Sequence, residues 1–128
     1  MNMSHLAKTF AGKTGIDVTK MENGKSEGVL NIRDDHLNSV GKVHGGVFCT
    51  MADVLCAVSV ISKIPGDLFP ITTDFNISFL KAVQKDQIRG VAEALHIGGR
   101  TAYSECSLYS GDTLVARATA TFAILKRQ

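Results

Sequence analysis

Residues 41–62, GKVHGGVFCTMADVLCAVSVIS, decide the fold because they predict one long helix with very little polar surface. From Val47 to roughly Ile61, apolar residues recur every three or four positions and therefore share one side of the helix. These residues are Phe48, Met51, Leu55, Val58 and Ile61. Much of the remaining circumference is small and apolar, so the helix needs neighbouring elements on nearly every side.

The segment before this helix predicts a β-hairpin followed by a long loop. Residues 16–21 and 28–32 are strand candidates on either side of the turn signal Asn23–Gly24. Residues 33–46 are polar and contain several glycines, so they predict a loop that delivers the chain into the helix. Loops of this length are typical of functional sites.

The segment after the helix predicts four more strands. Residues 63–67 contain Pro and Gly and break the helix. Residues 72–79 then alternate, with Thr73, Phe75, Ile77 and Phe79 on one face. Turn signals at 98–99 and 110–112 divide the remainder into an antiparallel meander with strands near 88–97, 101–109 and 114–125.

One buried helix with strands connected by tight turns favours an α+β fold, in which a curved antiparallel sheet wraps around the helix. We expect a single domain over residues 1–128, with 1–14 as a peripheral segment whose short helix, 4–11, stops at Gly12. A sheet covers only part of a helix, so the small-residue face predicts contact with the same face of a second protomer. We therefore expect at least a homodimer, with a dimer of dimers as the further possibility.

The composition argues against several function classes. The formal charge of +2 comes from 14 basic and 12 acidic residues spread along the chain, which does not predict nucleic-acid binding. Three cysteines give no disulfide framework and indicate a reduced, cytoplasmic protein. The amino terminus lacks the apolar core of a signal peptide, and polar residues interrupt the apolar run after Gly46 before it reaches membrane-spanning length. We therefore expect no membrane partner.

Asp53 is the exception in this apolar helix. A bare ionised carboxylate is costly in an apolar interior, so it must be protonated, paired or open to a water-filled cleft. One interpretation is a structural acid bonded to the backbone or to the Thr50 hydroxyl. The other is a functional acid, which the Gly45–Gly46 pair at the helix start favours. Glycine there gives a substrate oxygen access to free N–H groups, although it can also serve close packing alone.

The spacing of these residues bears on how a site could form. Gly45 and Asp53 are eight positions apart, which is about 12 Å along an α-helix, too far for both to touch one carbonyl group. Two antiparallel helices across a dimer interface would bring the glycine of one chain to the aspartate of the other. The sequence therefore predicts two equivalent sites, each shared between protomers.

The chain resembles a known family through a motif in its loop and central helix. The motif N-x-x-G-x-x-H-G-G, followed by Ala-Asp in the helix, is formed by Asn38, Gly41, His44, Gly45, Gly46, Ala52 and Asp53. TTDFNISFLKAV and the closing strands from Gly98 onward continue the similarity. On these residues the chain resembles the hotdog-fold acyl-CoA thioesterases of the phenylacetate-degradation (PaaI-like) type.

The resemblance implies hydrolysis of an acyl-coenzyme A thioester, without a metal or redox cofactor. It implies that the Gly45 N–H polarises the thioester carbonyl and that Asn38 and His44 support that end of the site. Asp53 of the facing protomer would act as general base or nucleophile, and Thr72 would position the water. For His44, fixing the loop through hydrogen bonds is an equal alternative.

Further candidates concern substrate binding. Gly46 and Thr73 are candidate substrate contacts, although Thr73 points to the opposite side of its strand from Thr72. Gly99 and Arg100 follow a turn where the guanidinium could meet a coenzyme A phosphate, as could Lys42 or Lys81, unless these cations are simply solvated.

Other residues that could carry chemistry are weaker candidates. Cys49 in a helix interior is expected to serve packing rather than nucleophilic attack. His5, His36 and His96 have no spacing typical of metal ligands.

Two alternative functions stay open at this point. One is a non-catalytic acyl-CoA binding module of the same fold, because fold does not fix function. The other is a hydratase or dehydratase, which would need a differently spaced histidine. The sequence does not define the acyl group.

Overall fold

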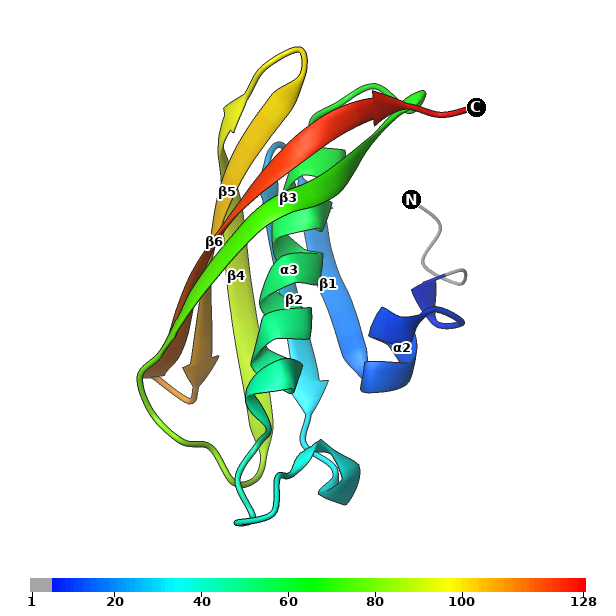
Figure 1. Cartoon of the computed structure of the whole chain (residues 1–128). Helices are drawn as coiled ribbons and strands as arrows, with labels where there is room; N and C mark the ends of the chain where they lie inside the picture. Colours follow the sequence, from blue (N-terminus) through cyan, green and yellow to red (C-terminus); the bar gives the residue numbers. More distant parts are fainter. Residues whose placement is uncertain (1–5) are drawn as a thin grey trace.

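The central helix, α3, spans Gly45–Ile61 and lies in the curve of one antiparallel sheet (Figure 1). This arrangement comes from a computed structural model, which describes residues 6–128. The sheet has six strands in the order β1-β2-β4-β5-β6-β3. The strands are β1 Ile16–Glu22, β2 Lys25–Asn31, β3 Leu68–Phe79, β4 Gln87–Ile97, β5 Thr101–Ser110 and β6 Thr113–Lys126. The α+β fold and the β4-β5-β6 meander predicted from the sequence are confirmed.

Several element boundaries differ from the predictions, including the starts of β2, α3 and β3. Helix α3 starts at Gly45 rather than Val47, because His44 caps the helix and both glycines form its first turn. Strand β3 starts at Leu68, four residues before the predicted start, and includes Pro70. Since β3 is an edge strand that, among the strands of residues 6–128, pairs only with β6, a proline without an N–H is tolerated there.

Close approach of α3 to the sheet depends on two facing glycines. Gly28 of β2 and Gly90 of β4 are register partners beneath the Leu55 side chain. A Cβ at Gly90 would lie 2.4 Å from Leu55 Cδ1, and one at Gly28 would lie 3.0 Å from Leu55 Cδ2. Because neither glycine has a side chain, the Leu55 side chain can lie directly on the sheet, and α3 approaches it closely.

Buried hydroxyl groups tie α3 to the sheet. Ser26 Oγ on β2 donates to the Leu55 carbonyl at 2.6 Å, and the hydroxyl oxygens of Ser59 and Ser104 lie 2.7 Å apart. All three serines are fully buried. Because a buried hydroxyl needs its partner, these bonds disfavour rotation of α3 about its own axis. They therefore fix which side of the helix stays uncovered.

The uncovered side of α3 is the one that carries Asp53. Along this side the residues are exposed or half-buried: Gly46, Thr50, Asp53, Val54, Ala57 and Ile61. Ile61, predicted to face the core with Phe48 and Leu55, is therefore half-buried instead. The predicted covering of this side by a second protomer stays a prediction. None of the helices in residues 6–128 is long and apolar enough to cross a membrane.

The amino-terminal segment differs from its prediction. Helix α2 spans Phe10–Thr14, so it continues through Gly12 and ends at Gly15, which has φ +98°. Glycine is favoured at such a left-handed position, and this explains why the helix ends there. The first residues of the predicted helix 4–11 lie outside the described residues. A short 3-10 helix, η1 Asp34–His36, interrupts the predicted loop 33–46.

Candidate active site

Asp53 is half-buried and has a hydroxyl partner on the edge strand. Thr72 Oγ1 donates a hydrogen bond to Asp53 Oδ1 at 2.7 Å. Thr50 Oγ1 instead donates to the Gly46 carbonyl at 2.8 Å, so the sequence-based alternative that pairs Asp53 with Thr50 is wrong. A hydrogen bond to one carboxylate oxygen fixes the carboxylate plane and leaves the other oxygen available.

A β-bulge places Thr72 toward the helix. The register of β3 with β6 shifts between Thr72, which pairs with Phe122, and Asp74, which pairs with Thr121. The strict alternation read from the sequence put Thr73 on the inner face with Phe75. The bulge instead turns Thr72 toward the helix and Thr73 away from it. Thr73 is exposed, and its hydroxyl donates to the Thr121 carbonyl at 3.2 Å. Thr73 therefore lies away from Asp53.

The Asp53 carboxyl group opens into a pocket of about 340 Å³, which we call the Asp53 pocket. Its walls come from α2, α3 and β3 and include Phe10, Cys49, Val54, Thr72 and Phe75. A second hollow of about 480 Å³ shares Phe10 and Thr50 with it and extends along α3. The carboxyl group therefore faces a mainly apolar space.

The thiol of Cys49 lines the same pocket. Burial raises its pKa, and the charge of Asp53 one turn along the helix raises it further. A raised pKa keeps the thiol protonated and unreactive at neutral pH. This agrees with the packing role expected for Cys49.

His44 caps the start of α3. The ring Nδ1 of His44 accepts the Gly46 N–H at 2.8 Å, and the backbone N–H of His44 donates to the His36 carbonyl at 2.8 Å. The Gly46 N–H is therefore occupied within the chain. Gly45 is the first helical residue, and among residues 6–128 no hydrogen bond is donated by its N–H. The donor left for a ligand is the Gly45 amide, at the positive end of the helix.

Asn38 shapes the loop that leads to this amide. Its Oδ1 accepts the N–H groups of Val40 at 3.1 Å and Lys42 at 3.0 Å, while Gly41 takes φ +79°. Because the oxygen is engaged by two N–H donors, the side-chain NH₂ group is the end that can donate elsewhere.

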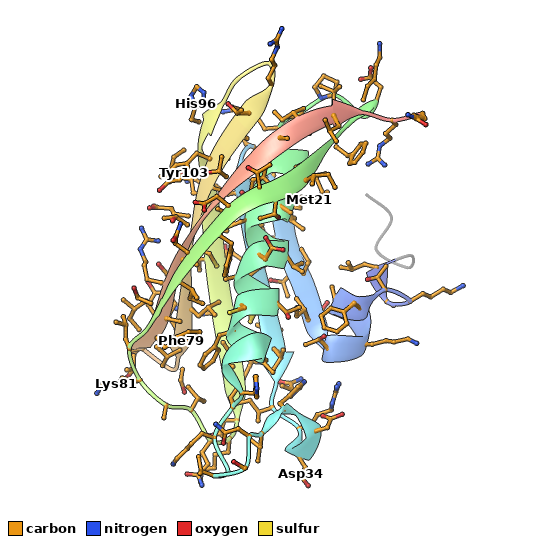
Figure 2. The ribbon with its side chains drawn as sticks, viewed as in Figure 1. Met21, Asp34, Phe79, Lys81, His96 and Tyr103 are labelled. Atoms are coloured by element: carbon orange, nitrogen blue, oxygen red, sulfur yellow. The ribbon has the colours of Figure 1, made fainter. Side chains whose placement is uncertain are left out.

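Asn38 and Gly45 line a separate pocket of about 360 Å³, which we call the Gly45 pocket. Its walls also include Lys42, Phe48, Phe79 and Lys81. Figure 2 shows Phe79 and Lys81 at the end of the sheet where α3 begins. The Asp53 pocket and the Gly45 pocket share no residue, so one chain does not bring the two groups together.

His36 is a buried residue that the sequence analysis considered only as a metal ligand. Its Nδ1 accepts the Arg33 N–H at 2.9 Å, and its Nε2 lies 2.5 Å from the Thr14 carbonyl. Together with the backbone N–H of His44, which donates to the His36 carbonyl, these bonds tie α2, the loop and the start of α3 to one residue. A histidine in a polar loop forms no sequence pattern that could have revealed this role.

Gly99 and Arg100 lie in the exposed turn between β4 and β5. The Arg100 carbonyl accepts the Ile124 N–H at 2.8 Å. In Figure 1 this hairpin extends at the end of the molecule opposite the start of α3. The structure brings neither residue into the two pockets, and their role in binding stays a prediction. Among residues 6–128 no three His, Cys, Asp or Glu side chains group as a metal site would require.

Comparison with known proteins shows which family and which solved structures this chain is similar to. The family model described as the thioesterase superfamily matches residues 40–117, from the loop before α3 to the first residues of β6. The 1,4-dihydroxy-2-naphthoyl-CoA hydrolase of Listeria monocytogenes is 25% identical over 115 residues, which cover 89% of this chain and 94% of the relative.

Two solved structures extend the similarity to three dimensions. A phenylacetic acid degradation-related protein from Ralstonia eutropha is 30% identical, with a TM-score of 0.82 over 88% of this chain and 87% of that one. A hypothetical thioesterase protein from Streptococcus pneumoniae, solved with coenzyme A, is 25% identical, with a TM-score of 0.80 over 88% of each chain.

Proposed function

Because the chain belongs to the thioesterase superfamily and is a thioester hydrolase, we propose that it hydrolyses an acyl-coenzyme A thioester to a free carboxylic acid and coenzyme A. The hotdog fold and the PaaI-like resemblance inferred from the motif are confirmed. The relative that acts on a naphthoyl-CoA and the neighbour solved with coenzyme A support an acyl-CoA substrate.

The proposed reaction uses one group from each of two subunits. The Gly45 N–H of one subunit donates to the thioester carbonyl oxygen, where negative charge develops in the transition state. Asp53 of the partner subunit either takes a proton from an attacking water or attacks the carbonyl carbon itself. In the first route the C–S bond breaks as the tetrahedral intermediate collapses, and the thiolate takes the proton held by Asp53. In the second, water hydrolyses the resulting anhydride, so both routes consume one water.

The other site residues would hold these two groups in place. Thr72 keeps the Asp53 carboxylate aimed into its pocket through the 2.7 Å hydrogen bond. His44 engages the Gly46 N–H and Asn38 holds the loop, which leaves the Gly45 N–H free for substrate. We assign positioning roles to Thr72 and His44, while the Asn38 NH₂ group can donate to the substrate.

A homodimer fits the surfaces that the single chain leaves open. Within residues 6–128, strand β3 has no partner on its outer edge and the α3 side that carries Asp53 is uncovered. An open edge and an uncovered helix side next to each other are typical of an isologous interface. Antiparallel α3 helices would set the Gly45 pocket of one subunit against the Asp53 pocket of the other.

The observation that carries the proposal is the Asp53–Thr72 pair on the uncovered side of α3. A purely structural aspartate would be enclosed by its partners, whereas this one faces an apolar pocket. The test is thiol release from a panel of acyl-CoA thioesters by the wild type and by Asp53→Asn. We expect the variant to stay folded and lose most of kcat, because an amide neither attacks nor takes the proton. Wild-type turnover in the variant would exclude this mechanism, and binding without thiol release by the wild type would favour the binding-module alternative.

A further inference from the structure

The two pockets differ in chemical character. The Asp53 pocket is walled by Phe10, Val54 and Phe75, and its one charged group is the carboxyl of Asp53 itself. The Gly45 pocket has two lysines, Lys42 and Lys81, and no carboxylate in its wall. A thioester bound between Gly45 and Asp53 would therefore meet an apolar space on one side and a cationic rim on the other.

The two lysines are available for an anionic ligand. Lys42 Nζ donates to the side-chain oxygen of Gln84 at 3.2 Å, a neutral partner. Neither lysine takes part in any of the ion pairs found among residues 6–128. Lys81 points out from the end of β3 in Figure 2. Their charge is therefore not neutralised by a neighbouring carboxylate.

Phe79 forms an apolar surface between the lysines and the Gly45 amide. Its side chain is 52% exposed, and its ring centroid lies 6.1 Å from that of Phe48. A Cβ on Gly45 would lie 3.3 Å from Phe79 Cζ, so the ring packs directly beside the helix start. A chain leaving a carbonyl bound at Gly45 would pass over this ring.

We propose that the coenzyme A arm leaves the reacting carbonyl through the Gly45 pocket, over Phe79 and toward Lys42 and Lys81, while the acyl group occupies the Asp53 pocket. This inference rests on the proposed function. In coenzyme A a flexible, partly apolar arm connects the thiol to the negatively charged phosphates. In the Gly45 pocket, Phe79 can contact the arm, and Lys42 and Lys81 can contact the phosphates. The acyl group has no such charge, and the Asp53 pocket offers it aromatic and aliphatic walls.

The acyl half of the inference assigns a specificity role to Phe10. This side chain is 74% exposed on α2, yet it lines both the Asp53 pocket and the 480 Å³ hollow beyond it. Phe10 therefore stands between the two spaces. Removing its ring joins them and gives a longer acyl group room along α3.

The test compares acyl-CoA with the same acyl group on N-acetylcysteamine, a thiol that keeps the reacting end and lacks the phosphates. The variant is Lys42→Gln/Lys81→Gln, and the control, Lys20→Gln/Lys25→Gln, removes the same charge from β1 and β2. We expect the KM for acyl-CoA to rise about three- to tenfold, as loss of two exposed ion pairs would give. The kcat for acyl-CoA and all constants for the truncated thioester should stay at the wild-type values, and added salt should reduce the difference.

Three other outcomes would contradict the lysine assignment, the path of the coenzyme A arm or the proposed function. Equal effects on both thioesters, or no effect on either, overturn the lysine assignment. A loss confined to acyl-CoA in Arg100→Gln but absent in the lysine variant places the arm at the β4–β5 turn and overturns the inference. If the wild type releases thiol from neither substrate series, the proposed function itself fails.

Phe10→Ala tests the acyl half separately. We expect the preferred acyl length to increase, to the same extent in the coenzyme A and N-acetylcysteamine series. An unchanged acyl preference, or a change seen in the coenzyme A series alone, overturns this half. Because Phe10 is largely exposed, its replacement should leave the fold intact, and circular dichroism checks this.

Discussion

Thr72 Oγ1 donates a 2.7 Å hydrogen bond to Asp53 Oδ1 and so joins the edge strand β3 to the middle of α3. The contact exists because a bulge at Thr73 turns Thr72 inward. It gives the one acid on the uncovered side of the helix a fixed orientation. The strand and the helix thus form one half of the proposed site together.

Thr72→Val should lower kcat for acyl-CoA hydrolysis by about 10- to 100-fold, because a hydrogen bond to a charged group contributes roughly 1.5–3 kcal/mol. Valine keeps the shape of the side chain and removes only the hydroxyl. Thr72→Ser should restore most of the activity. Thr73→Val is the matched control, since the Thr73 hydroxyl bonds the Thr121 carbonyl away from Asp53. Equal losses at both threonines in steady-state kinetics would contradict the positioning role.

The sequence predicted the elements well and the contacts less well. The apolar period of α3 and the turn signals gave the helix and all six strands, because these patterns are local. The alternation in residues 72–79 correctly predicted a strand but grouped Thr73 with Phe75, although the family resemblance singled out Thr72, the threonine that bonds to Asp53. A bulge depends on how β3 meets β6, and no local pattern encodes it.

In the candidate site, too, residues with an unusual local pattern could be predicted from the sequence, whereas roles that depend on the fold could not. Gly45 and Asp53 could be singled out because glycines at a helix start and a carboxylate in an apolar helix are unusual in themselves. The role of His36 depends on the Arg33 N–H, the His44 N–H and the distant Thr14 carbonyl, so it became visible only in the folded chain. The separate pockets of Gly45 and Asp53 agree with the eight-residue spacing argument.

Gly45→Pro should remove the proposed oxyanion donor without breaking the helix. Gly45 is the first helical residue, where proline is favoured, and His44 before it is extended at φ −62° and ψ 137°, as a residue preceding proline prefers. We expect kcat to fall about 10²–10³-fold, as for loss of one oxyanion donor. Gly45→Ala is the control, because it adds a Cβ at 3.3 Å from Phe79 and keeps the N–H. If alanine and proline reduce kcat equally, crowding against Phe79 explains the loss instead of the missing donor.

Gly90→Ala should destabilise the fold by about 1–3 kcal/mol, the cost of overpacking a core. Its Cβ would lie 2.4 Å from Leu55 Cδ1 and 2.9 Å from Leu108 Cδ2, so α3 or the sheet must move. Urea unfolding at one protomer concentration measures the difference, because the stability of an oligomer depends on concentration. Gly66→Ala, which meets nothing within 4 Å, should unfold at the wild-type urea concentration. A wild-type midpoint for Gly90→Ala would contradict the packing described for Leu55.

Mixing two inactive variants tests whether the site is shared between subunits. Asp53→Asn keeps an intact Gly45, and Gly45→Pro keeps an intact Asp53, so each homodimer has two defective sites. If each site takes Gly45 from one subunit and Asp53 from the other, a mixed dimer has one intact site and one with both defects. With random exchange half of the dimers are mixed, and about a quarter of the wild-type activity should return. A site contained in one chain gives no recovery, since every chain then carries a defect. The recovered activity should also depend on exchange of subunits between dimers. As a control, long-lived dimers of the two variants that are mixed without prior dissociation should stay inactive.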